Sequence, residues 1–291
     1  MALSEEIRAG CAAIAESARS VSVGRLNADF ALSGEITPPL DPELHYLEGA
    51  PEEVARFFFT LDSINFGSGW FPTLRKRVGH SGYGTVAASL RDQFVAFGPW
   101  SNEQLRAIDT PTVARVLDQP ADHELMSLFA QALRDLGRWL GGGGALDAIG
   151  RAGGSAERLA EQVAGGMALF RDPPFYKRAQ LLASDLSLAG VASFSDLDRL
   201  TIFADNVVPH VLRCDGVLVY DAQLAARIDA GQLLVPGGEE REIRACAVIA
   251  CEQLAARHGV EPHVLDNWLW NRGRAAEYKA RPRHRCRCVF Y

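Results

Sequence analysis

Apolar residues recur every three or four positions along most of this chain, which is the spacing of one face of an α-helix. Residues 124–140 form the clearest example and predict one long amphipathic helix. Further helices are predicted over residues 4–17, 86–97, 175–189, 196–205, 239–258 and 262–270. Only residues 217–220 and 233–235, together with a pair within 21–42, suggest short strands. We therefore predict a mainly α, helical bundle-like fold with a few short strands.

Two glycine-rich stretches, Gly141–Gly144 and Gly150–Ser155, interrupt the helical pattern. Neither follows a predicted strand, and neither ends in the Gly-Lys-Ser/Thr of a phosphate loop. We predict that residues 141–154 connect two helical halves, residues 1–140 and residues 155–291. The alternative is that the two halves pack together as one compact unit.

Composition and charge exclude several classes of protein. The 291 residues are 48% hydrophobic and 23% charged, which is typical of a globular chain and not of a disordered one. No run of apolar residues is long enough to span a membrane, so we expect a cytoplasmic protein without a membrane partner. A net charge of -6 argues against a stable complex with nucleic acid, because such binding needs many basic contacts to phosphate.

The cysteines and histidines lack the spacings of metal sites. No Cys-x-x-Cys or His-Glu-x-x-His pattern occurs, and Cys286 and Cys288 alone do not complete a ligand set. We expect neither a metal nor another cofactor.

The first polar cluster lies in the aromatic stretch after residue 50. Pro51 and the two acidic residues after it predict a helix start, and we expect this helix to run into residues 61–66. On it Asp62, Asn65 and Phe66 share one face, with Trp70 close behind. A carboxylate, an amide and aromatic rings suit the edge and face of a purine-like base. The alternative is a capped helix with an aromatic core stripe.

The second cluster follows Pro173 and Pro174, which predict a helix start. Tyr176, Lys177 and Arg178 then fall in the first turn, where a cation opposes the helix dipole unless an anion is near. The cluster indicates a phosphate site. A solvated basic turn is the alternative.

The third cluster contains Asp205, which follows an apolar run and precedes Pro209. This position suits either a helix cap or a catalytic carboxylate. The fourth cluster is the tail, where strand-like alternation predicts His284, Cys286, Cys288 and Phe290 on one side. A disordered basic tail is the alternative.

Taken together, five ordered blocks resemble the queuosine salvage protein family. They are residues 61–66, 174–180, 200–212, 242–245 with Leu269-Trp270, and 284–291. The resemblance implies an N-glycosidase that hydrolyses queuosine 5′-phosphate to queuine and ribose 5-phosphate. It also implies a fold similar to that of helix-hairpin-helix DNA glycosylases.

On this resemblance, Asp205 is the catalytic carboxylate. Asp62 and Asn65 are expected to bind the base edge, and Phe66 or Trp70 to stack on the base. The other implied substrate contacts are Tyr176, Lys177, Arg178, Gln180, His210, His284, Arg285 and Tyr291. Two alternatives remain: a glycosylase that excises damaged bases from DNA, and a non-catalytic helical protein that binds a nucleotide.

Overall fold

A computed structural model describes residues 2–24, 32, 36–37 and 39–291 of the chain. The chain divides into two compact units, which we name after their longest helices. The α12 unit comprises Met1–Pro38, Asp172–Lys177 and Asp198–Cys288. The α6 unit comprises Pro39–Arg171, Arg178–Leu197 and Val289–Tyr291. Both units are therefore assembled from segments that are far apart in the sequence.

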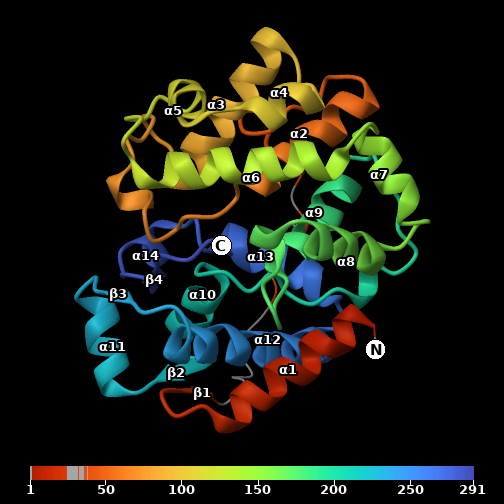
Figure 1. The fold of residues 1–291 in the computed structure, drawn as a ribbon. Coiled ribbons are helices and arrows are strands. Elements are labelled where there is room, and N and C mark those ends of the chain that lie inside the picture. The colour runs from red at the N-terminus through yellow and green to blue at the C-terminus, as the bar shows by residue number, and fades with distance from the viewer. Residues whose placement is uncertain (1, 25–31, 33–35, 38) are drawn as a thin grey trace. The chain divides into compact units, whose positions relative to one another are not determined.

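In the α12 unit, the 21-residue helix α12 (Gly238–His258) is the central element (Figure 1). Its buried side chains include Ala245, Ala250 and Cys251, which are small enough to let neighbouring helices approach closely. Helices α1 (Leu3–Ser17), α10 (Val208–Cys214) and α13 (Pro262–Arg272) pack against it. The unit also contains α11 (Ala222–Asp229) and α14 (Ala276–Lys279).

Two small sheets complete the α12 unit. Strand β1 (Val21–Val23) pairs antiparallel with β2 (Leu218–Tyr220), with Ser22 opposite Val219. Strand β3 (Leu233–Leu234) pairs parallel with β4 (Arg285–Cys286). The strands at 217–220 and 233–235 are confirmed, but β1 pairs with β2 instead of a partner within 21–42; residues 25–31, 33–35 and 38 of that segment lie outside the described residues.

In the α6 unit, helix α6 (Glu124–Leu140) buries one face that carries Phe129, Leu133 and Leu136. Helices α2 (Pro51–Ser63), α4 (Asn102–Ala107) and α5 (Thr110–Val116) pack against it (Figure 1). A side chain at Gly137 would come within 2.7 Å of the Arg106 backbone nitrogen, so only glycine permits this approach of α4 to α6.

The rest of the α6 unit consists of helices, short 3₁₀ turns and the last three residues of the chain. Its helices are α3 (Gly82–Phe97), α7 (Ala145–Arg151), α8 (Ala156–Gly166) and α9 (Lys177–Leu188, from Arg178 onward). The turns are η1 (Phe71–Thr73) and η2 (Ala168–Phe170), and a third, η3 (Leu197–Arg199), lies where the chain enters the α12 unit.

The mainly α prediction is confirmed, and three predicted helix boundaries are wrong. Helix α2 ends at Ser63, and Gly67 follows with a φ of 106°. Helix α9 begins at Lys177 because Tyr176 has a left-handed φ of 46°. Residues 200–204, predicted as helix, are not helical. The similarity to helix-hairpin-helix glycosylases stays a prediction.

Among the described residues, no helix has the length and hydropathy needed to cross a bilayer. The cysteines are all free thiols, and five of them are buried: Cys11, Cys246, Cys251, Cys286 and Cys288. Burial raises the pKa of the Cys246 thiol to about 11 and that of the Cys11 thiol to about 12. These thiols are protonated at neutral pH.

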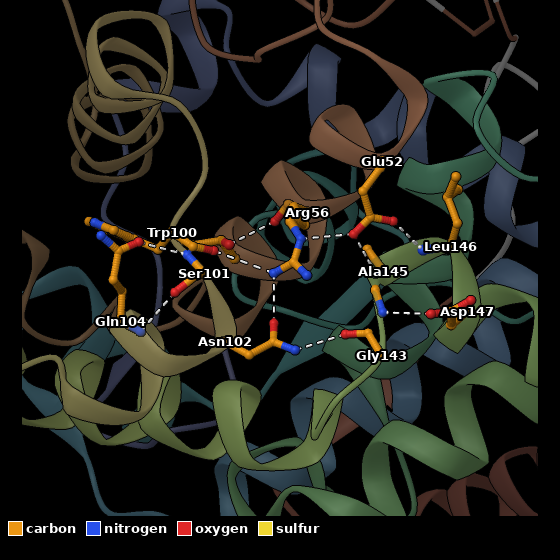
Figure 2. A network of polar contacts seen from close by, with 12 residues as sticks. Glu52, Arg56, Trp100, Ser101, Asn102, Gln104, Gly143, Ala145, Leu146 and Asp147 are labelled. Atoms are coloured by element: carbon orange, nitrogen blue, oxygen red, sulfur yellow. Dashed lines mark hydrogen bonds and ion pairs between the residues drawn. The ribbon is translucent and has the colours of Figure 1, made fainter.

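Residues 141–154, predicted as a flexible connection, belong to the α6 unit and include helix α7. Glu52 of α2 holds the start of this helix, because its carboxylate accepts the Ala145 and Leu146 N–H groups, both at 2.8 Å (Figure 2). Arg56 donates to the same carboxylate at 2.8 Å and to the Asn102 side chain at 2.7 Å. The network joins three helices at a glycine-rich turn.

Substitution Glu52→Ala removes the cap of α7 and leaves Arg56 without its carboxylate. We expect the free energy of unfolding to fall by about 1–2 kcal/mol, measured by urea denaturation. Glu103→Ala, on the exposed first turn of α4, is the control and should cost less than half as much. Equal losses for the two variants would contradict the capping role.

Candidate functional site

Asp205 lies in the α12 unit at the start of helix α10, where it is half-buried. Its Oδ1 atom accepts the Val207 N–H at 2.6 Å and the Val208 N–H at 3.1 Å. These two bonds hold the carboxylate in place at the start of the helix. The sequence offered a helix cap as the alternative to catalysis, and Asp205 does bind N–H groups at the start of α10. These bonds use only its Oδ1 atom.

Hydrogen bonds to distant residues hold the segment on both sides of Asp205. The Phe203 N–H donates to Asp266 Oδ1 of α13 at 2.8 Å. The Ala204 carbonyl accepts Arg244 Nε of α12 at 2.8 Å. Asn206 Nδ2 donates to the His284 carbonyl at 3.1 Å. These three contacts fix the segment from Phe203 to Asn206, which has no regular secondary structure.

Arg244 is itself held rigidly. Its side chain is 1% exposed, and its guanidinium group pairs with Asp172 and, at 3.3 Å, with Glu240. The Phe175 ring lies 3.9 Å from the guanidinium carbon, so a cation–π contact covers one face. A buried cation with two buried carboxylates has little freedom to move, and the Ala204 carbonyl is fixed with it.

Charged groups gather around Asp205 within the α12 unit. Its negative charge raises the proton affinity of Arg283 and Asp266, and the charge of Lys177 acts on Asp266. Burial, assisted by Asp205, raises the pKa of Asp266 to about 8. Burial lowers the pKa of Arg283, and Asp205 opposes that effect. The cluster combines an anion beside a helix start with sheltered cations, which suits a charged substrate.

The two predicted histidines are buried and uncharged at neutral pH. Burial lowers the pKa of His210, whose Nε2 lies 2.8 Å from the Tyr278 carbonyl. Burial and nearby arginines lower the pKa of His284 to about 3. The backbone carbonyl of His284 accepts Asn206 Nδ2. The substrate contacts proposed for His210 and His284 stay predictions.

The predicted tail strand is confirmed in part. Residues 285–286 form β4, and His284, Cys286 and Cys288 are buried on one side as the alternation predicted. The Arg285 side chain donates to the Gly231 carbonyl at 2.7 Å, and this bond connects β4 to the residue two positions before β3. Tyr176 donates its hydroxyl to Glu6 at 2.9 Å. The substrate contacts proposed for Arg285 and Tyr176 stay predictions.

In the α6 unit, Asp62, Asn65 and Phe66 do not share a helix face, because α2 ends at Ser63. The predicted geometry is therefore wrong, although Asn65 Nδ2 still donates to Asp62 Oδ1 at 3.2 Å. The ring of Phe66 packs edge-on against Phe129, with centroids 5.1 Å apart. Trp70 donates its indole N–H to Glu124 at 2.7 Å. Their roles in binding a base stay predictions.

Arg178 binds backbone carbonyls within the α6 unit, and its predicted contact with the phosphate stays a prediction. Its Nη1 atom donates to the Asp62 and Ser63 carbonyls at 3.0 and 2.8 Å. Its Nη2 atom donates to the carbonyls of Leu169 and, at 2.9 Å, Val289. The guanidinium plane lies between two rings, those of Phe66 and Phe170. With both terminal nitrogens bound to backbone carbonyls, Arg178 joins the end of α2 to the last residues of the chain.

The last residues complete this arrangement. The main-chain oxygen of Tyr291 accepts the Gly67 N–H at 2.9 Å and the Ser68 N–H at 3.3 Å. Gln180 is fully buried on α9, and Tyr291 is 3% exposed. The tail of the α6 unit is therefore ordered, contrary to the alternative of a disordered basic tail.

Sequence reasoning missed Asp266, Arg244 and Arg283. Asp266 lies among Leu265, Trp268 and Leu269, and an acidic residue inside such an apolar pattern is a signal of a buried functional or paired carboxyl. Arg244 gave no comparable signal, because an arginine on a helix is usually exposed. Among the described residues, no group of three potential metal ligands occurs.

Comparison with known proteins identifies the relatives of this chain. The family model described as queuosine salvage protein matches residues 44–291. The chain belongs to the queuosine salvage protein family. All the site candidates discussed above, from Asp62 to Tyr291, lie inside the matched range.

Curated members of the queuosine salvage protein family match over nearly the whole chain. A protein of Sphaerobacter thermophilus is 34% identical over 93% of this chain and 91% of its own length. Proteins of Mus musculus and Bos taurus are each 28% identical, over 85% and 96% of this chain and 86% and 96% of their own length. All three are named queuosine 5′-phosphate N-glycosylase/hydrolase.

Substitution Arg178→Lys tests the structural role of this guanidinium group in the salvage protein. Lysine cannot reach four carbonyls at once, so we expect the free energy of unfolding to fall by about 3 kcal/mol or more, measured by urea denaturation. Arg171→Lys, an exposed position after η2, is the matched control and should change it by less than about 0.5 kcal/mol. Unaltered stability of Arg178→Lys would contradict this structural role.

Proposed function

We propose that this chain hydrolyses the N-glycosidic bond of queuosine 5′-phosphate and releases queuine and ribose 5-phosphate. The observation that carries the proposal is similarity along nearly the full length to proteins named for this activity, from a bacterium to mammals. The substrate is a small nucleotide, and the predicted cytoplasmic location is part of the same proposal.

Asp205 is the residue that we assign to the chemical step. Cleavage of a ribosyl C–N bond passes through a cation-like sugar, which a nearby carboxylate stabilises. Water adds to C1′ and gives up a proton to a general base. The departing heterocycle takes up a proton. The N–H bonds from Val207 and Val208 support this role, because they fix the position of the Asp205 carboxylate.

The leaving base needs hydrogen bonds at its edges. A 7-deazapurine lacks the ring nitrogen that purine hydrolases protonate, so negative charge on the departing base must be absorbed elsewhere. We assign the edge of the base to Asp62 and Asn65, which are already joined by a hydrogen bond of 3.2 Å. The Asn65 amide donates to the departing base, and the Asp62 carboxylate accepts an N–H of the base. Trp70 or Phe66 is proposed to stack on the base.

Lys177 is the residue that we assign to the 5′-phosphate. It is 6% exposed, and its charge acts within the same cluster as Asp205 and Asp266. A sheltered ammonium group binds a phosphate more strongly than an exposed one, because water screens it less. The substrate contact of Arg178 stays a prediction, and its terminal nitrogens bind backbone carbonyls.

Substitution Asp205→Asn tests the catalytic assignment. The amide oxygen still accepts the Val207 and Val208 N–H groups, so the fold is retained, but the negative charge is lost. We expect the turnover number to fall by about a hundredfold or more. The assay is chromatography of queuine released from queuosine 5′-phosphate, with circular dichroism as the check of folding. Asp221→Asn, another helix cap in the α12 unit, is the control.

Wild-type turnover also separates the alternatives. Release of a damaged base from duplex DNA, with none from the nucleotide, would indicate a DNA glycosylase. Stoichiometric binding without release would indicate a binding protein, and either result would overturn the proposal.

Substitution Lys177→Ala tests the phosphate assignment. We expect kcat/KM for queuosine 5′-phosphate to fall by about tenfold or more, while kcat/KM for queuosine, which lacks the phosphate, changes by less than about threefold. The exposed Lys279→Ala is the control. Equal losses on the two substrates would show that Lys177 acts elsewhere than at the phosphate.

A further inference from the structure

Asp266 is a buried carboxyl group that the proposed reaction does not use. It lies on α13 and is 5% exposed, and its Oδ1 accepts the Phe203 N–H at 2.8 Å. Phe203 stands two residues before Asp205, and the intervening Ala204 carbonyl is held by Arg244. Asp266 therefore controls the position of the segment that presents Asp205.

Two charged groups act on Asp266, and Asp266 in turn acts on a third titratable group. Burial has the largest effect on its pKa and raises it, the charge of Asp205 raises it further, and the Phe203 N–H bond and the charge of Lys177 lower it, so that the pKa is about 8. The third group is Cys251 of α12, whose pKa burial raises well above its usual range, so this thiol is neutral near pH 8. Of the two carboxyl groups, the more deeply buried one thus binds the proton at neutral pH.

We propose that Asp266 is a positioning residue for Asp205: its carboxyl group accepts the Phe203 N–H and so anchors the segment that carries Asp205. This inference rests on the proposed function. Loss of the Asp266 proton places a second carboxylate beside Asp205 and Lys177. The two carboxylates repel each other, and the new one competes for the Lys177 ammonium group.

The pH profile of kcat/KM tests the inference. In the wild type, activity at pH 9 should be about a tenth of that at pH 7, because only about a tenth of a group with a pKa of about 8 remains protonated there. Asp266→Asn keeps an oxygen for the Phe203 N–H but cannot ionise. Its alkaline limb should move up by at least about one pH unit.

Two further variants distinguish this effect from a purely structural one. Asp266→Leu loses the oxygen that Phe203 requires and should lower kcat/KM by about tenfold or more at pH 7. Asp221→Asn should keep the wild-type alkaline limb. If Asp266→Asn lowers activity by the same factor at every pH, the role is structural only and the inference is overturned. A limb that moves to lower pH would assign the titration to Lys177 and would overturn it as well.

Stability provides an independent measurement. A carboxyl whose pKa is raised in the folded state stabilises the fold at low pH, and that contribution is lost as the pH rises to the folded-state value. The urea midpoint of the wild type should therefore fall relative to that of Asp266→Asn between about pH 4 and pH 8, and then level off. A constant difference over this range would overturn the protonated state that we infer for Asp266.

Failure of the proposed function has a different signature. If the wild type releases no queuine at any pH, the proposed function fails, and the positioning role fails with it. If the wild type is active but the alkaline limb of Asp266→Asn does not move, only the inference about Asp266 fails.

Discussion

Arg244 places a positive charge in the interior of the α12 unit, and burying a guanidinium group costs several kcal/mol unless its N–H groups are satisfied. Asp172 and Glu240 supply the compensating charges, and the Ala204 carbonyl accepts the remaining Nε–H. The irregular segment before α10 is thereby attached to the longest helix of the unit. Arg244 with Asp172 and Glu240 forms a buried ion cluster that holds the segment before Asp205. The position of Asp205 therefore depends on residues to which we assign no part in the reaction.

Arg178 plays the same part in the α6 unit, with carbonyl oxygens in place of carboxylates. The planar guanidinium group reaches several acceptors at once and stacks on aromatic rings, which a lysine ammonium group does not do. The guanidinium group of Arg178 therefore joins backbone segments, a role that the neighbouring Lys177 could not take. Nearly all basic residues of the chain are arginines, and the structure uses two of them as internal connectors.

Much of the fold followed from the sequence, because amphipathic spacing determines a helix locally. The helix predicted over residues 124–140 is α6 to the residue, and that over 262–270 is α13 with two more residues. The errors occur where tertiary contacts override the local pattern. Helix α2 stops at Ser63, where Arg178 binds the carbonyls of Asp62 and Ser63, and no sequence rule anticipates that contact. Residues 200–204 are apolar because they are buried, and their backbone groups bond to Arg244 and Asp266 instead of to a helix.

For the candidate site, the sequence could indicate individual residues but not how they interact. Asp205 and Lys177 carried signals in their own neighbourhood, a cap position and a helix start. The partner that we infer for Asp205 comes from a helix some sixty positions further along the chain, and its proton affinity depends on burial and on a neighbouring charge. Such coupling has no local signature.

The buried cysteines have a consequence for chemical work on the molecule. A thiol reacts with electrophiles and oxidants only as its anion, and burial keeps Cys11, Cys246 and Cys251 in the unreactive form. A cysteine introduced at Val78, which is fully exposed, would therefore be alkylated far faster than these three. A maleimide dye or spin probe could then be attached there while these native sulfurs stay unmodified.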